Sequence, residues 1–265
     1  MKNKIIFIIM FCICASFVIA PAQDGIISHW NFDGNANDLI GSNHGTVTGA
    51  NLASGVSGQA YNFNGGEIHN INVGNDISLK PTDQFTISTW VSPDDYADAW
   101  GGAGFIIADG RDCCGFTGGL GLHLMTDQKP RGYIWGTDGN QYEIKGNPLI
   151  TEEWNHIVFT FNGVDLSIYQ NGISTSKRTI NQNSVSRNSA SMEIGRHVYG
   201  GANSHFVFHG KIDEIKMWSR ALSDVEIKEV YGRSSSEEII QETKNWIKEI
   251  STLTNVVEII RIYEG

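Results

Sequence analysis

The sequence predicts an all-β fold, an antiparallel two-sheet jelly-roll sandwich, followed by a C-terminal helical tail. Three observations predict it. Between residues 24 and 231, short apolar segments are separated by Gly, Asn, Asp and Ser about every ten residues, the spacing of an antiparallel sandwich. Several of these segments alternate apolar and polar residues, as half-buried strands do. Thirty of the 265 residues are glycine, which suits a chain with many tight turns.

Residues 1–22 are expected to be a signal peptide. Lysines stand at positions 2 and 4, and residues 5–20 are an almost unbroken apolar run. Residues 20–22, Ala-Pro-Ala, follow as an A-x-A cleavage pattern, and this order is typical of Sec-type export. The run is shorter than the roughly 20 apolar residues that a membrane-spanning helix needs. We therefore expect a secreted protein, extracellular or periplasmic, that is cleaved near Ala22.

Residues 23–232 are expected to form a single jelly-roll domain. Residues 85–91 alternate strictly, with one face beginning at Phe85 and the other at Thr86. Asn162–Gly163 and Asn171–Gly172 read as tight turns, because Asn-Gly pairs tolerate positive φ. The further predicted strands are residues 105–108, 121–125, 133–135, 157–161, 166–170 and 211–218.

Two helical segments are expected at the end of the chain. Ser223 and Glu226 form a capping box, which predicts a short helix to about residue 231. In residues 233–265, apolar residues recur at spacings of four and three, a heptad-like stripe. A helix docked on the domain, a linker and a self-associating helix all fit this stripe.

The composition limits the partners. The formal net charge is −10, and an acidic chain is a poor match for nucleic acid, whose phosphates require a Lys/Arg surface. No segment after residue 22 is long and apolar enough to be a membrane span. Calcium and neutral glycans are both compatible with this balance.

Several segments together resemble the laminin-G-like branch of the concanavalin A-like lectin/glucanase superfamily. No single segment is specific, but their order along about residues 27–231 matches the family's order. The segments are residues 27–34 (ISHWNFDG), 58–65 (GQAYNFNG), 85–91 (FTISTWV), 154–158 (WNHIV), 166–172 (LSIYQNG), 210–215 (GKIDEI) and 220–223 (RALS).

The resemblance implies two antiparallel sheets of six or seven strands, packed face to face, with one sheet concave. It also implies a structural calcium ion between the first and last strands. Asp33, Asp213 and the carbonyl of Gly65 are the ligands that it suggests, and calcium prefers such oxygen donors. The alternative is that the two aspartates cap turns or pair with lysines. Relatives bind glycans, bind proteins or accompany hydrolases, so the fold alone does not settle the function.

Cys113 and Cys114 are the only cysteines after residue 22. This is no disulfide framework, so an apolar core must stabilise the fold. In an exported protein we expect the pair to form a vicinal disulfide. Such a bond is strained, because a trans peptide holds the two Cα atoms about 3.8 Å apart. Reduced buried thiols, intermolecular bridging and a metal pair are the alternatives.

Aromatic, arginine and aspartate side chains near glycines suit a glycan site, since they offer stacking planes and partners for hydroxyl groups. By analogy with the concave face of the superfamily, we expect the ligand-binding residues to be Trp100, Asp109, Arg111, His123, Trp135, Arg196 and Tyr199.

The sequence argues against catalysis. Glucanases of the superfamily carry alternating acids on one strand, and the nearest string here, residues 211–214, lacks the first glutamate. A lyase would need a group such as His123, Tyr133 and Arg196. We therefore predict a secreted, non-catalytic, lectin-like domain that binds a glycan or polysaccharide and holds a structural calcium. An extracellular protein-interaction or adhesion module is the alternative, and a polysaccharide-active enzyme is less favoured.

Overall fold

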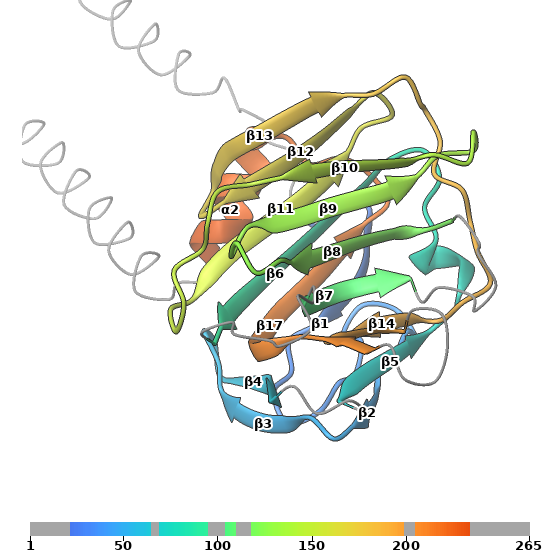
Figure 1. Cartoon of the computed structure of the whole chain (residues 1–265). Coiled ribbons are helices and arrows are strands. Elements are labelled where there is room, and N and C mark those ends of the chain that lie inside the picture. Colours follow the sequence, from blue (N-terminus) through green and yellow to red (C-terminus); the bar gives the residue numbers. More distant parts are fainter. Residues whose placement is uncertain (1–21, 65–68, 95–103, 110–117, 199–204, 234–265) are drawn as a thin grey trace, which may run out of the picture.

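The computed structural model describes residues 22–64, 69–94, 104–109, 118–198 and 205–233. Within these residues the chain forms two antiparallel sheets that face each other, as Figure 1 shows. The fold class predicted from the sequence is confirmed. The signal peptide and nearly all of the helical tail lie outside the described residues, so both stay predictions. Among the described residues, no helix has the length and apolar character to cross a membrane.

Sheet A has eight strands in the order β13-β12-β11-β6-β17-β4-β3, with β1 paired to β17. The resemblance suggested six or seven, and pairing of both β1 and β4 with the long β17 enlarges the sheet. Its strands are β1 (Ile26–Trp30), β3 (Asn51–Ser54), β4 (Gln59–Asn64), β6 (Phe85–Pro93), β11 (Asn155–Phe161), β12 (Asp165–Gln170), β13 (Ile173–Thr179) and β17 (His209–Trp218).

Sheet B has seven strands in the order β10-β9-β8-β7-β14-β5-β2. A separate two-stranded ribbon, β15–β16, packs against β7. These strands are β2 (Thr46–Thr48), β5 (Asn70–Gly74), β7 (Gly104–Asp109), β8 (Leu120–Leu124), β9 (Pro130–Trp135), β10 (Gln141–Lys145), β14 (Met192–Ile194), β15 (Arg196–Val198) and β16 (His205–Val207). A short 3₁₀ helix, η1 (Ile77–Leu79), precedes β6.

The two predicted tight turns have the expected backbone. Asn171 and Gly172 have φ of +50° and +75°, which places both in the left-handed region that the sequence pair favours. At the other turn, the side chain of Asn162 accepts hydrogen bonds from the N–H groups of Val164 and Asp165. These turns connect β11, β12 and β13 into a meander.

The main core lies between the sheets. Phe85 and Phe159 are fully buried and meet edge to face, with ring centroids 5.2 Å apart. Gly132 on sheet B faces this cluster, and a Cβ there would lie 2.5 Å from the Phe159 ring. Large aromatic rings of sheet A therefore fill the space that a small residue of sheet B leaves open.

The outer face of sheet A is partly covered by helix α2 (Asp224–Arg233), which lies behind the sheets in Figure 1. The predicted capping box is present, since Glu226 accepts a hydrogen bond from the Ser223 N–H at 2.8 Å. Tyr231 stacks on Trp90 at a centroid distance of 5.5 Å. The chain's own helix thus occupies this face, and the outer face of sheet B holds the groove described next.

Candidate functional site

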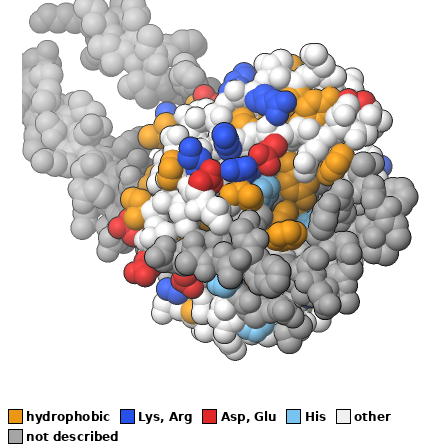
Figure 2. Space-filling view, viewed as in Figure 1, with side chains coloured by type: hydrophobic (Ala, Val, Ile, Leu, Met, Phe, Trp, Pro, Cys, Tyr) orange, Lys and Arg blue, Asp and Glu red, His pale blue; other side chains and the backbone are white. Residues whose placement is uncertain are grey.

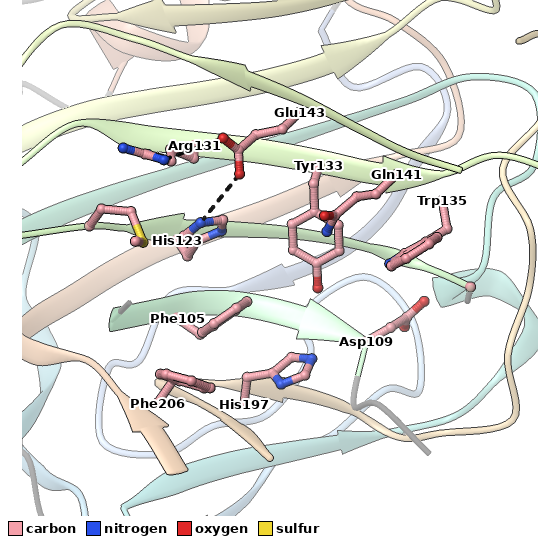
Figure 3. A pocket seen from close by; sticks show the side chains of 12 residues that line it. Phe105, Asp109, His123, Arg131, Tyr133, Trp135, Gln141, Glu143, His197 and Phe206 are labelled. Carbon is pink, nitrogen blue, oxygen red and sulfur yellow. Dashed lines mark hydrogen bonds and ion pairs between the residues drawn. The ribbon is translucent and has the colours of Figure 1, made fainter. Parts of the chain in front are cut away.

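The outer face of sheet B contains a groove of about 440 Å³, called here the aromatic groove. Figure 2 shows apolar, histidine and oppositely charged side chains gathered over this face, and Figure 3 shows the groove from close by. It is lined by Phe105, Asp109, Gly118, His123, Met125, Arg131, Tyr133, Trp135, Gln141, Glu143, His197 and Phe206.

Strand alternation places most of these side chains. Arg131, Tyr133 and Trp135 occupy every second position of β9 and point away from the core, whereas Ile134 is buried in it. Gln141 and Glu143 do the same on β10, opposite Trp135 and Tyr133. Neighbouring strands therefore present a continuous row of aromatic and polar groups.

A β-bulge in β7 adds the central aromatic residue. The pairing of β7 with β8 shifts between Phe105 and Ile107, so Ile106 and Ile107 both enter the core and Phe105 faces the groove. The Phe105 ring stacks on His123 at 4.8 Å and lies 4.5 Å from the ring of His197. This cluster forms a largely apolar wall.

The other side of the groove is charged. Arg131 contacts Glu143 at 3.4 Å and Asp127 at 2.9 Å. Burial, reinforced by the positive charge of Arg131, lowers the pKa of His123 to about 3, so its imidazole is neutral at pH 7. The 3.9 Å approach of His123 Nε2 to Glu143 is therefore not an ion pair at neutral pH.

Two lining residues hold polar atoms without hydrogen-bond partners in the described part of the chain. They are Nδ1 of His123 and Nε of Arg131, both fully buried. A neutral imidazole can donate at one nitrogen and accept at the other. Buried polar groups normally find a hydrogen-bond partner. The described protein atoms alone leave these two nitrogens without one.

Gly121 fixes the position of Tyr133. The two residues are cross-strand partners, and a Cβ at residue 121 would lie 2.5 Å from the Tyr133 ring. The tyrosine ring thus lies over a backbone that has no side chain. This contact is the counterpart, on the outer face, of the packing of Phe159 over Gly132.

Asp109 marks one end of the groove but is engaged in structure. It pairs with Lys80 at 2.9 Å, and the side chains are 2% and 3% exposed. Burial raises the pKa of Asp109 to about 6, although Lys80 acts against this rise. Lys80 also donates to Asn188 Oδ1 at 3.0 Å, so this ion pair joins three segments of the chain.

Arg196 lies beside a different cavity. A second cleft of about 590 Å³ on the same face of sheet B, called here the amide cleft, is lined by Thr46, Thr48, Asn70, Asn72, Glu193 and Arg196. His197, the next residue of β15, lines the aromatic groove instead. The ribbon therefore separates the two cavities.

Of the predicted ligand-binding residues, the structure brings Asp109, His123 and Trp135 together and places Arg196 in the neighbouring cleft. Trp100, Arg111 and Tyr199 lie outside the described residues. The sequence analysis missed Phe105 because of the bulge. It also missed Arg131, Gln141 and Glu143, which the alternation of β9 and β10 would have revealed. His197 and Phe206 depend on the packing of the ribbon.

The two predicted calcium ligands in the described residues act as turn acceptors. Asp33 accepts a hydrogen bond from the Gln59 N–H at 2.8 Å, and Asp213 accepts one from the Val56 N–H at 2.9 Å. Among the described residues, no three His, Cys, Asp or Glu side chains are grouped to hold a metal. Gly65 lies outside those residues. These contacts fit the turn-capping alternative, and calcium stays a prediction.

Asp213 is nevertheless unusual for a turn acceptor. It is completely buried, and burial together with the charge of Glu214 raises its pKa to about 7. Glu214 itself is paired with His29 and Lys216. Cys113 and Cys114 lie outside the described residues, so their predicted disulfide also stays a prediction.

Comparison with solved structures shows the same fold in several binding domains. Domain 4 of AbnA, a GH43 extracellular arabinanase from Geobacillus stearothermophilus in complex with arabinotriose, matches with a TM-score of 0.57 and 19% identity, covering 78% of this chain and 98% of that one. The binding domain of Paraclostridial Mosquitocidal Protein 1 matches with a TM-score of 0.63 and 19% identity, covering 80% and 53%. The binding domain of botulinum neurotoxin serotype G matches with a TM-score of 0.64 and 16% identity, covering 79% and 51%.

The chain therefore spans nearly all of the arabinanase domain but about half of each toxin binding domain. Identities this low show the fold alone. No curated protein matches the sequence. A family profile, Laminin_G_3, matches residues 64–228, which is more than half of the chain. The order of motifs, the two-sheet architecture and this match agree, and the chain belongs to the concanavalin A-like lectin/glucanase superfamily.

Proposed function

We propose that the protein is a non-catalytic carbohydrate-binding domain whose ligand lies in the aromatic groove. One observation carries the proposal: the stacked rings of Phe105 and His123 line the same groove as the polar side chains of Arg131, Gln141 and Glu143. Sugars have apolar faces and polar edges, and ligand sites combine apolar surface with a few convergent polar groups in this way. The arabinotriose complex of the arabinanase domain supports the same class of ligand.

The strands β9 and β10 supply both kinds of contact. Trp135 on β9 is the half-buried ring on which a sugar face can stack. Arg131 of the same strand, with Gln141 and Glu143 of β10, supplies donors and acceptors beside it. The guanidinium of Arg131 already contacts two carboxylates, so the lining is mixed in charge and does not favour a strongly anionic ligand.

A glycan array tests this proposal. Neutral plant and bacterial oligosaccharides, arabinotriose and sialylated glycans would be displayed together. We expect binding to a class of neutral glycans, and at least a tenfold weaker affinity in Trp135→Ala, the loss of about 1.4 kcal/mol. Trp154→Ala is the control, since Trp154 is also half-buried but does not line the groove. No binding to any glycan by the folded protein would contradict the proposal and favour a protein partner.

Export and a structural calcium complete the proposal. The charged, apolar and small-residue order of residues 1–22 supports export. For calcium, the supporting observation is that Asp213 contacts Val56 and Asp33 contacts Gln59, so two carboxylates lie at one turn, and calcium prefers oxygen ligands. The vicinal disulfide of Cys113 and Cys114 is also part of the proposal. Free-thiol titration of the purified protein tests it, and two titratable thiols would contradict it.

The residues that a lyase would need, His123, Tyr133 and Arg196, do not come together in one cavity. His123 and Tyr133 line the aromatic groove, whereas Arg196 lines the amide cleft. Burial lowers the pKa of His123 to about 3, which makes its imidazole a weak base. This group therefore does not favour a lyase.

A further inference from the structure

The amide cleft has the construction of a second recognition site. Thr46 pairs with Asn72 and Thr48 with Asn70 across β2 and β5, and Asn72 pairs in turn with Glu193 of β14. The intervening residues Val47 and Ile71 point to the core. Strand alternation therefore places a block of hydroxyl and amide side chains on the same outer face of sheet B as the aromatic groove.

Asn70 is the residue that demands an explanation. It is only 5% exposed, yet its side-chain amide makes no hydrogen bond within the described part of the chain. It lines the cleft, so the opening of the cleft is the direction in which a partner is available. An amide that lines the cleft without a partner among the described residues can both donate a hydrogen bond to a ligand and accept one from it.

The charges of the cleft are balanced. Arg196 contacts both carboxylate oxygens of Glu193, with Nε–Oε2 and Nη2–Oε1 distances of 3.1 Å. Such two-point pairs hold both groups in fixed positions. With this pair neutralised, the remaining lining is amide and hydroxyl, which both donate and accept hydrogen bonds. This chemistry matches an uncharged, hydroxyl-rich ligand, and the described lining residues include no aromatic ring for stacking.

The two cavities are immediate neighbours. Arg196 lines the amide cleft and His197 lines the aromatic groove, and consecutive Cα atoms are about 3.8 Å apart. Among the described residues, the ribbon strand β15 lies between them at this point. A ligand that extends past the aromatic groove on this side would meet the amide cleft next.

We propose that the amide cleft is a second glycan subsite, which binds an uncharged sugar unit through hydrogen bonds alone. This second subsite rests on the proposed function of the aromatic groove. It implies that the protein recognises oligosaccharides long enough to occupy both sides of the β15–β16 ribbon. The aromatic groove holds one part of the chain by stacking, and the amide cleft holds a later part through Asn70 and its neighbours.

The test is NMR of the ¹⁵N-labelled protein, titrated with linear trisaccharides and hexasaccharides of arabinan and of β-glucan. The indole N–H of Trp135 reports on the aromatic groove, and the side-chain amide of Asn70 reports on the amide cleft. Asn70→Leu and Trp135→Phe spectra assign the two signals. We expect a hexasaccharide to shift both signals and the matching trisaccharide to shift mainly the indole.

Calorimetry provides the quantitative arm. Asn70→Leu should weaken hexasaccharide binding about fivefold to tenfold and leave trisaccharide binding unchanged, because one or two hydrogen bonds are lost. Ser174→Ala, at an exposed position of β13 in the opposite sheet, is the control and should change neither.

The outcomes separate the two proposals. A shift of the Trp135 indole alone, with wild-type hexasaccharide affinity in Asn70→Leu, overturns the second subsite and leaves the aromatic groove intact. A shift of the Asn70 amide alone supports the cleft and contradicts the groove. No shift of either signal with any of the four probes overturns both for neutral saccharides.

Discussion

Gly121 and Gly132 offer a matched pair of substitutions that separates stability from binding. Both glycines lie on adjacent strands of sheet B, one facing the aromatic groove and the other facing the core. A methyl group at residue 121 would lie 2.5 Å from a ring carbon of Tyr133, and one at residue 132 would lie 2.5 Å from a ring carbon of Phe159. Carbon atoms pack comfortably at about 3.5 Å, so each ring must move by about 1 Å.

The expected stability losses are similar. Overpacking of this kind costs about 1–3 kcal/mol, and each kcal/mol lowers Tm by roughly 2–4 °C in a domain of this size. The consequences for the ligand differ. Gly121→Ala pushes Tyr133 into the groove, whereas Gly132→Ala displaces a ring on the other side of the sheet. We expect Gly121→Ala to weaken glycan binding at least tenfold, about 1.4 kcal/mol, and Gly132→Ala to leave it within about twofold.

Urea unfolding and calorimetric titration with the array-selected glycan measure the two quantities. The reasoning is refuted if folded Gly121→Ala binds as tightly as the wild type. It is equally refuted if Gly132→Ala loses binding to the same extent, since the loss would then follow general destabilisation.

Three further predictions concern buried charges. Lys80→Met should destabilise the protein by about 3–5 kcal/mol in urea unfolding, because Asp109 is left buried and unpaired, and adding Asp109→Asn should recover part of the loss. Arg220 holds the pKa of Glu226 at about 2, so the wild type should lose stability as pH falls from about 4.5 to 2, and Glu226→Gln should show a flatter acid profile in circular dichroism. If calcium binds beside Asp213, a chelator should lower Tm by about 5–10 °C in a thermal melt, and an unchanged Tm would exclude a stabilising metal.

The sequence predicted the fold well because its signals are local. The strict alternation from Phe85 to Val91 became β6, and the Asn171–Gly172 pair became a turn with two positive φ angles. The capping box of Ser223 and Glu226 opened α2 as expected. Each of these features depends on residues within a few positions of one another, so a single sequence contains the information.

The site was only partly predictable because it depends on non-local register. Trp135 and His123 were identified as candidates, but their neighbour Phe105 reaches the groove only through the bulge in β7. Simple alternation would have placed Phe105 and Ile107 on the same face. Arg196 was predicted to bind the ligand together with Trp135 and His123, but the ribbon directs it to the amide cleft. No spacing in the sequence indicates on which side of the ribbon it lies.

The position of β17 has a consequence for how the protein is made. This strand is the last of the sandwich in sequence, yet it pairs with β1, β4 and β6 in the interior of sheet A. The two halves of the sheet share no ladder until residues 209–218 have left the ribosome. Sheet A can therefore be completed only once its last strand is available, through contacts distant in sequence. Until then β4 and β6 expose unpaired edges, which any factor that accompanies the nascent chain would need to protect.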